Sequence, residues 1–165
     1  MTRYALIPLT LWLGLQSASA LDRIGQSTFS VLFWDIYTAQ LFNQEGRYLG
    51  LTGPLRLSLT YHRQIDAIEL LEATESQWQR MGYQDAASQR WLQQMGPCFP
   101  DVDVGHTLSF YLAEDSSASL DWNGQRRCNF DSSEGNRQFL AIWLSRDSAD
   151  PGFTRQLTGA QGGRP

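Results

Sequence analysis

The stretch GPCFPDVDVGHTLSFYL brings together residue types that bind metal ions or transfer protons. Cys98, Asp101, Asp103 and His106 lie within nine residues of one another. A structural zinc ion needs four nitrogen or sulfur ligands, usually supplied as two closely spaced pairs. Cys98 has no cysteine nearby, the chain has only one other histidine, His62, and a calcium loop would need more oxygen ligands at regular spacing. The sequence therefore predicts no metal site here and no cofactor.

The same residues fit a joint between a helix and a strand. Gly96 and Pro97 are a strong stop signal, because glycine can take the left-handed cap and proline cannot continue a helix. Pro100 favours an extended Phe99, whose ring we expect in the core. The two aspartates are typical turn residues. His106 would begin the next strand as a surface or edge residue, and a lone histidine without a paired nucleophile is weak evidence for catalysis.

Residues 1–20 are typical of a secretory signal. A positive start at Arg3 precedes the apolar run Tyr4–Leu15, and small residues follow up to Ala20. The run is too short for a membrane span, which needs about 20 apolar residues. An uncleaved anchor and a buried helix are the alternatives. We expect cleavage after Ala20, a periplasmic or secreted protein, and a single mature domain at residues 21–165 without a transmembrane segment.

Charge and cysteine content narrow the class of partner. The formal net charge is −4, and no basic stripe is present, which argues against nucleic acid as a partner. We expect a monomer.

An exported chain meets an oxidising compartment, so its two cysteines, Cys98 and Cys128, are expected to form one disulfide. Two free buried thiols are the alternative.

The elements that must position these residues begin with strands. The segment 27–42 is rich in β-branched and aromatic residues and fits one long strand or two joined by a bend. The segment 54–62 alternates apolar and polar residues, which indicates a half-buried strand. Its apolar face carries Leu55, Leu57, Leu59 and Tyr61. A further strand begins at His106, and Asn123-Gly124 is a good hairpin turn beyond it.

Helices separate and follow the strands. The first helix starts near Asp66, with an apolar stripe of Ile68, Leu71, Trp78 and Met81. The second runs from about Asp85 to Met95 and turns Ala87, Trp91 and Met95 inward. A capping-box spacing at Asp131–Glu134, with aspartate at the cap, starts a helix that carries Phe139, Ile142 and Trp143 inward. A short last helix begins at Asp150-Pro151. We expect Trp78, Trp91 and Trp143 in the core and leave Trp34 and Trp122 unassigned. The order of the predicted elements is strands, then two helices, then strands, then helices. It predicts an α+β fold, an antiparallel sheet covered on one face by helices.

Several short motifs, by their order and spacing along the chain, resemble those of the bacterial chalcone isomerase-like family. They include Phe99–Val102 with Gly105, Asn123-Gly124, Phe139–Ser145, Ile36–Leu41 and Leu59–Ile65. The match covers about residues 25–158. Two positions depart from the pattern, because His106 follows Gly105 where the family often has aspartate, and Cys98 stands where an apolar residue is usual. The resemblance implies an open-faced β-sandwich, a curved antiparallel sheet wrapped by helices with a cleft between them.

The resemblance also allows the catalytic positions to be checked. The enzymes of the family use a strand arginine, a threonine and a tyrosine that position water, and a helix asparagine, which together stabilise an oxyanion. The arginine falls at best on Arg23, at the mature terminus. The threonine position falls on Tyr37, and the helix tyrosine and asparagine positions fall near Asp66 and Ala73. We therefore assign no catalytic residue and expect a non-catalytic relative, with an isomerase acting on a chalcone-like or enone substrate as the alternative.

Another branch of the family binds fatty acids through an arginine and a tyrosine that hold the carboxylate. Tyr61 and Arg63 are the candidate pair here, with Tyr37 nearby if the two strands adjoin. Tyr61 also fits a plain core position, and Arg63 a solvated charge or a partner for Asp66. We expect an exported domain that binds a fatty acid or other small apolar carboxylic acid in its cleft, and an envelope protein-interaction or scaffold domain is a further alternative.

Overall fold

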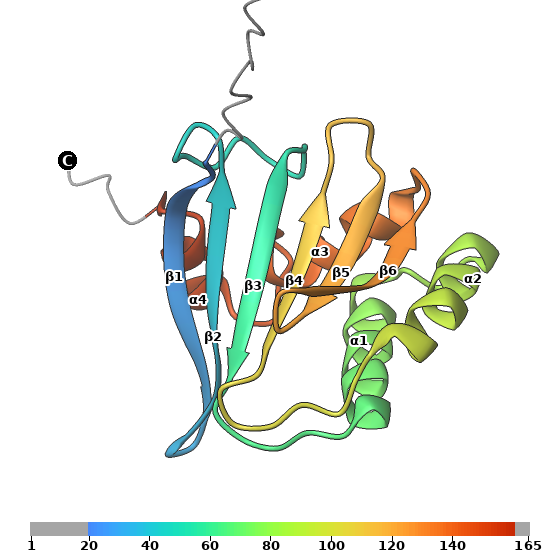
Figure 1. Cartoon of the computed structure of the whole chain (residues 1–165), viewed down its shortest axis with the longest axis horizontal. Coiled ribbons are helices and arrows are strands. Elements are labelled where there is room, and N and C mark those ends of the chain that lie inside the picture. The colour runs from blue at the N-terminus through green and yellow to red at the C-terminus, as the bar shows by residue number, and fades with distance from the viewer. Residues whose placement is uncertain (1–19, 161–165) are drawn as a thin grey trace, which may run out of the picture.

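The computed structural model describes residues 20–160 of the chain, so the expected signal segment, apart from Ala20, lies outside the described residues (Figure 1). Six strands form one antiparallel sheet in chain order. They are β1 Asp22–Val31, β2 Trp34–Asn43, β3 Leu55–Tyr61, β4 Thr107–Leu112, β5 Ala118–Trp122 and β6 Gln125–Phe130. The helices are α1 Ala67–Met81, α2 Ala86–Met95, the short 3-10 helix η1 Gly96–Cys98, α3 Glu134–Leu144 and α4 Pro151–Leu157.

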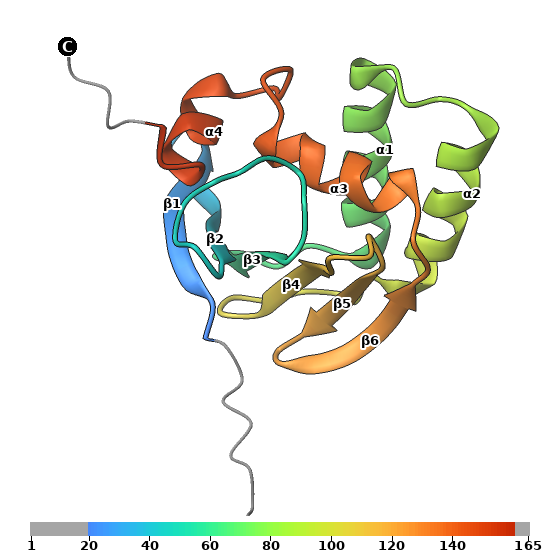
Figure 2. The same ribbon diagram turned by 90° about the horizontal axis from the view of Figure 1, so that it is seen from above.

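The four α-helices of residues 20–160 cover the same face of the curved sheet (Figure 2). The chain leaves the sheet after β3 to form α1 and α2, and it returns through η1 to β4. At the far edge α4 packs closely on β1. A Cβ atom at Gly25 would lie only 2.4 Å from the carbonyl oxygen of Leu157, so this contact requires glycine. The expected α+β architecture is confirmed.

The alternation of apolar and polar residues predicted for β3 is confirmed. Leu55, Leu57, Leu59 and Tyr61 are all buried on the helix-covered side, as the alternation predicted. Of the two alternatives for segment 27–42, the structure shows two strands joined by a turn, and β1 starts earlier than expected, at Asp22. The two residues between β1 and β2 make a tight turn, because Val31 pairs directly with Trp34.

The apolar stripe predicted for α1 is wrong at its first member. Ile68 is 58% exposed, and the buried residues of α1 are Thr74 and Trp78. Asp66 is the N-cap and forms a capping box with Glu69, which pins the start of the helix and turns Ile68 toward solvent. In α2, Ser88 and Leu92 are buried together with the expected Trp91 and Met95, whereas Ala87 is exposed.

Two predicted helix ends also differ. Gly96 keeps a right-handed conformation, with φ −47°, because the chain tightens into η1 instead of stopping at a left-handed cap. The N-cap of α3 is Ser133 rather than Asp131, and no side-chain capping bond forms there. The backbone carbonyl of Asp131 instead accepts a hydrogen bond from the side chain of Asn136.

The stretch rich in metal-ligating residue types serves as a structural joint. Asp101 accepts a hydrogen bond from the backbone N–H of Ala67 at 2.8 Å, which holds the start of α1. The backbone N–H of Asp103 donates to Nδ1 of His106 at 3.1 Å, and Phe99 is buried in the core. Within residues 20–160, no three histidine, cysteine or acidic side chains gather closely enough to hold a metal ion.

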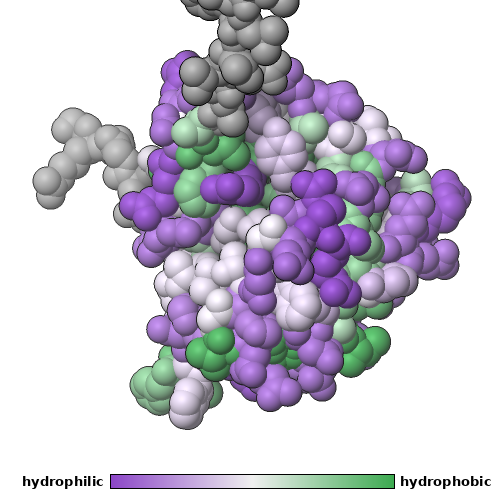
Figure 3. All heavy atoms as spheres, in the orientation of Figure 1, coloured by the Kyte–Doolittle hydropathy of each residue, from purple (hydrophilic) through white to green (hydrophobic). Residues whose placement is uncertain are grey.

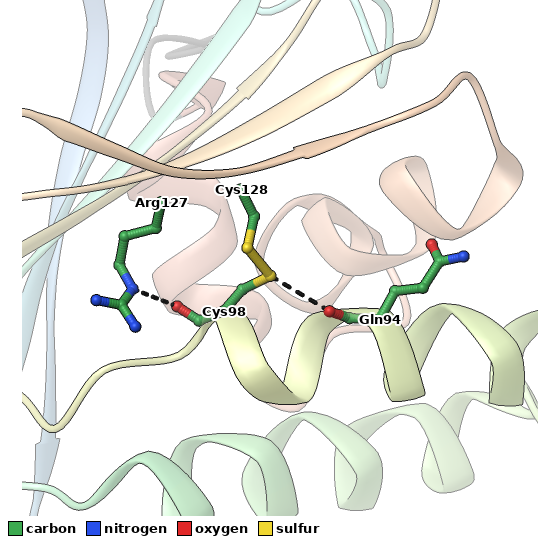
Figure 4. Close-up of a disulfide and its surroundings, with 4 residues drawn as sticks. All are labelled: Gln94, Cys98, Arg127 and Cys128. Atoms are coloured by element: carbon green, nitrogen blue, oxygen red, sulfur yellow. Dashed lines mark hydrogen bonds between the residues drawn. A yellow bond between two sulfur atoms is a disulfide. The ribbon is translucent and has the colours of Figure 1, made fainter.

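The predicted disulfide is present between Cys98 and Cys128. It ties η1, behind the sheet, to the edge strand β6 (Figure 4). The guanidinium of Arg127 donates to the carbonyl oxygen of Cys98 at 2.8 Å and reinforces the same joint. Sγ of Cys98 lies 3.2 Å from the carbonyl oxygen of Gln94, and this is a contact without a donated proton, since a disulfide sulfur carries none.

Candidate functional site

A cavity of about 270 Å³ lies between the sheet and helices α1, α3 and α4. Its walls are largely apolar: Phe29, Ile36, Leu57, Leu59, Ile65, Leu70, Phe99, Leu108, Phe110, Leu120, Phe139, Ile142 and Phe153. The exposed residues of the lining are Glu69, Ala73, Ala149 and Asp150. The mouth of the cavity therefore lies between α1 and the segment that connects α3 to α4.

Two local periodicities bring these residues together. The period of two along β3 turns Leu57, Leu59 and Tyr61 toward the helices. The period of about four along α1 places Glu69, Ala73 and Gln77 on one stripe beside the mouth. Sequence reasoning missed this stripe because it is mostly polar and small, while the buried face was sought among large apolar residues.

Tyr37 and Tyr61 form the polar centre of the cavity wall. They are direct partners across β2 and β3, and their ring centroids lie 5.9 Å apart. The indole N–H of Trp143 donates to the Tyr37 hydroxyl at 3.0 Å, and the ring of Phe29 stacks on the ring of Tyr37. The expectation that Tyr37 and Tyr61 lie together is met. Trp143, expected in the core, is half-buried and lines the cavity instead.

Both phenols stay neutral near neutral pH. Burial raises the pKa of Tyr37 to about 12; the hydrogen bond from Trp143 opposes this shift, and the charge of Asp150 adds to it. Burial raises the pKa of Tyr61 as well, and the neighbouring Tyr37 contributes. A general base is most effective with a pKa near the working pH. These tyrosines are therefore suited to hydrogen bonding with a bound molecule and poorly suited to proton abstraction.

The hydrogen-bonding capacity left for a ligand is small. The hydroxyl of Thr74 donates to the backbone of Leu70, and Ser148 and Thr154 bond to each other at 2.5 Å. Among residues 20–160, no group hydrogen-bonds the hydroxyl of Tyr61, although this side chain is only 3% exposed. Its oxygen is not one of the fully buried polar atoms that lack a partner in this part of the chain, so it is open to the cavity and free to bond the polar end of a ligand.

Charge at the mouth is negative. Glu69 and Asp150 are the charged residues of the lining, and no arginine of residues 20–160 borders the cavity. Arg63, predicted as the carboxylate partner, is exposed and lies outside the lining. The reason is local: β3 ends at Tyr61, and the chain bends through residues 62 and 63, so the alternation that turns Tyr61 inward no longer applies to Arg63.

The positions carried over from the family's enzymes are scattered. Tyr37 and Ala73 line the cavity, but Arg23 is exposed on β1, where it bonds to Gln26 at 3.4 Å. Asp66 caps α1. As far as the described part of the chain shows, the cavity holds hydroxyl groups and the amide of Gln77 without a cation, which is a poor set for stabilising an oxyanion.

Comparisons with known proteins agree with this architecture. No protein-family model matches the chain. An uncharacterized protein of Haemophilus influenzae is 28% identical over 140 residues, which are 82% of this chain and 67% of that protein. The crystal structure of a fatty-acid binding protein of Arabidopsis thaliana superposes with a TM-score of 0.65 at 13% identity, covering 87% of this chain and 89% of that one. At this identity the likeness shows the fold, and the chain therefore has the chalcone isomerase-like fold, an open curved antiparallel sheet covered by helices.

Proposed function

We propose that this protein binds a small apolar molecule with one uncharged polar end, such as a fatty alcohol or a protonated fatty acid, in the cavity between sheet and helices. The observation that carries the proposal is the largely apolar cavity with the unpartnered hydroxyl of Tyr61 in its wall. Ligand sites in proteins are typically apolar clefts with a few convergent polar groups. The structural likeness to a fatty-acid binding protein supports the same class of ligand.

The electrostatics favour an uncharged polar end over a carboxylate. A carboxylate loses its hydration on entering an apolar cavity and needs a cation or several donors in return. Here it would meet neutral phenols inside and two carboxylates, Glu69 and Asp150, at the mouth. A carboxylic acid is therefore expected to bind in its protonated form, with its pKa raised by burial and by the neighbouring negative charges.

The size of the cavity favours short ligands. Small-molecule sites usually enclose roughly 300–1,000 Å³, and this cavity, at about 270 Å³, is slightly below that range. We expect decanol to bind more tightly than octadecanol, because the longer chain would leave apolar surface in water.

Replacement of Ala73 by tryptophan is expected to weaken decanol binding by about tenfold or more, because the new ring would fill the mouth that Ala73 borders. Titration calorimetry on the wild-type protein and the variant measures this. Ser76→Trp is the matched control, since Ser76 is exposed on the same helix but does not line the cavity. Wild-type affinity in Ala73→Trp, or no binding of decanol to the wild type, would contradict the proposal.

Decanoic acid tests the charge argument in the same assay. If only the protonated acid binds, its apparent affinity falls about tenfold for each unit of pH between 6 and 8, while the affinity for decanol stays constant. Tight binding of the acid at pH 8 without pH dependence would show that the carboxylate itself is held, and it would refute the uncharged end.

We also propose that the protein acts outside the cytoplasm. The signal-like segment of residues 1–20 supports this, and so does the disulfide between Cys98 and Cys128, since such bonds persist in oxidising compartments. Mass spectrometry of the exported protein is expected to find Leu21 as the first residue of a domain that runs to residue 165. Recovery of the full-length chain from the cytoplasm alone would contradict this.

A further inference from the structure

The turn between β1 and β2 is made of residues that turns normally avoid. Leu32 and Phe33 connect the strands, flanked by Val31 and Trp34, and the four side chains are 87%, 97%, 49% and 72% exposed, respectively. Leu32 has a positive φ of 56°, a conformation strained for a leucine and favoured by glycine or asparagine. The β5–β6 turn of the same protein shows the usual solution, with Asn123 and Gly124 at positive φ.

Other exposed apolar residues lie at the same end of the sheet. Val104 belongs to the loop that precedes β4, where the backbone N–H of Gly105 donates to the carbonyl of Tyr61, the last residue of β3. Ile68 is in the first turn of α1, just after β3. Of the large apolar residues that are exposed within residues 20–160, only Leu49 lies elsewhere, in the loop between β2 and β3. Hydrophobic surface appears at the projecting β1–β2 hairpin and again where α1 begins (Figure 3).

The hairpin is a stiff projection rather than a loose loop. The Ser30 hydroxyl donates to Asp35 at 2.6 Å across its base, and Thr28 bonds to Thr38 at 2.9 Å one step further along. Thr38 in turn bonds to His62 at 2.8 Å, which ties the stem to the end of β3. The apolar tip is thus held out from the body by a hydrogen-bonded stem.

We infer that this apolar end docks on a lipid bilayer, with Leu32 and Phe33 entering the acyl boundary and Trp34 at headgroup level. Aromatic residues with an apolar body and one polar group favour that level. A stable protein–protein interface buries roughly 800 Å² per partner. A convex tip of four residues, two of them aromatic at roughly 150–250 Å² each, supplies less than that. A bilayer needs no complementary groove and accepts such a tip.

The charges at this end select the kind of bilayer. The segments 31–36, 62–69 and 101–106 contain five acidic residues, Asp35, Asp66, Glu69, Asp101 and Asp103, against one arginine, Arg63. Negative charge near the contact is repelled by anionic headgroups. The occupant is therefore a zwitterionic surface, such as phosphatidylcholine, and anionic lipid weakens the contact.

The docking end also adjoins the cavity. Phe29 and Ile36, on the two strands of the hairpin, line the cavity, and Glu69 at the mouth is one residue from Ile68. Docking would thus place the mouth near the lipid from which an apolar ligand partitions. The entry of a ligand from the lipid into the cavity rests on the proposed function, whereas docking on the bilayer does not.

The test is flotation of the full mature protein with phosphatidylcholine vesicles. The wild type is expected to float, and the double variant Leu32→Asn/Phe33→Gly is expected to lose about tenfold or more in partition coefficient. This variant copies the β5–β6 turn and removes a strained residue, so the fold is expected to persist, and its thermal unfolding verifies this. Leu49→Asn is the matched control, with an exposed apolar residue removed at the other end of the sheet, and it is expected to float like the wild type.

Each outcome decides the inference. No flotation of the wild type overturns it, and so does wild-type flotation of the double variant. Phe33→Ser offers a second variant if the double one does not fold. Stronger binding on addition of phosphatidylglycerol would overturn the charge argument, and self-association lost in the double variant without vesicle binding would identify a protein contact instead. Ala73→Trp should float normally while binding decanol weakly, so failure of docking and failure of the cavity proposal are distinguishable.

Discussion

Replacement of Asn136 by alanine is expected to lower the free energy of unfolding by about 3–5 kcal/mol. The side chain of Asn136 is fully buried, and its carbonyl oxygen accepts from the indole N–H of Trp91 at 2.8 Å. Its amide donates to the backbone carbonyls of Ser116 and Asp131, both at 2.9 Å. Alanine would leave one buried donor and two carbonyls without partners, each at a cost of about 1–3 kcal/mol. Urea denaturation followed by tryptophan fluorescence measures the loss.

The location of Asn136 explains why so much depends on it. Its three bonds join α3 to α2, to the loop between β4 and β5, and to the segment that leaves β6. Asn129→Ala is the matched control, because Asn129 is exposed on β6 and only accepts a bond from Arg126. That change is expected to stay within about 0.5 kcal/mol. An equal, small effect of both substitutions would contradict a structural role for the Asn136 network.

Removal of the disulfide in Cys98→Ala/Cys128→Ala is expected to cost about 3–4 kcal/mol. The bond closes a loop with a sequence separation of 30, and in the chain-entropy account a loop of this length restricts the unfolded state by about that amount. The loss should be largest near β6, an edge strand that pairs only with β5 and is otherwise held from behind by this bond. Denaturant unfolding of the oxidised wild type and the variant measures the difference.

Reduction of the wild-type protein provides the control. Dithiothreitol should lower the stability of the wild type to about that of the double variant and leave the variant unchanged. If the wild type keeps its full stability after complete reduction, confirmed by thiol labelling, the disulfide does not contribute as described. Amide exchange should speed up in β6 before it does in β3, which lies between two neighbours in the sheet.

Much of the fold followed from local patterns. The alternation in β3 predicted which residues face the helices, and the two-residue turn at Asn123-Gly124 was recognised because asparagine and glycine tolerate positive φ. A bend between two strands was one of the two alternatives for segment 27–42, but its position at Leu32-Phe33 was not predicted, because leucine does not favour the positive φ of Leu32 and the apolar run continues through the turn. The error in the predicted stripe of α1 has a similar cause. The exposure of Ile68 follows from the capping box at the start of the helix, which the hydrophobic periodicity does not describe.

The candidate site could be predicted only in part. Tyr61 was named from the family resemblance and Tyr37 as its neighbour if the two strands adjoin, and the two residues do pair across β2 and β3. Trp143, Gln77 and Asp150 were missed as lining residues, because the elements that carry them meet only when α1, α3 and α4 pack over the sheet. Arg63 was paired with Tyr61 on the family resemblance, and the bend after β3 separates them.

The sequence by itself determined the antiparallel sheet under helices and the pairing of Cys98 with Cys128, because hydrophobic period, turn chemistry and cysteine count are local or countable properties. Only the tertiary structure decided that helices and sheet leave a cavity between them, that its mouth is acidic, and that apolar side chains gather at one end of the sheet. A cavity is the space that packed side chains fail to fill, and a surface patch is the sum of residues from distant segments. Neither quantity belongs to any single stretch of the chain.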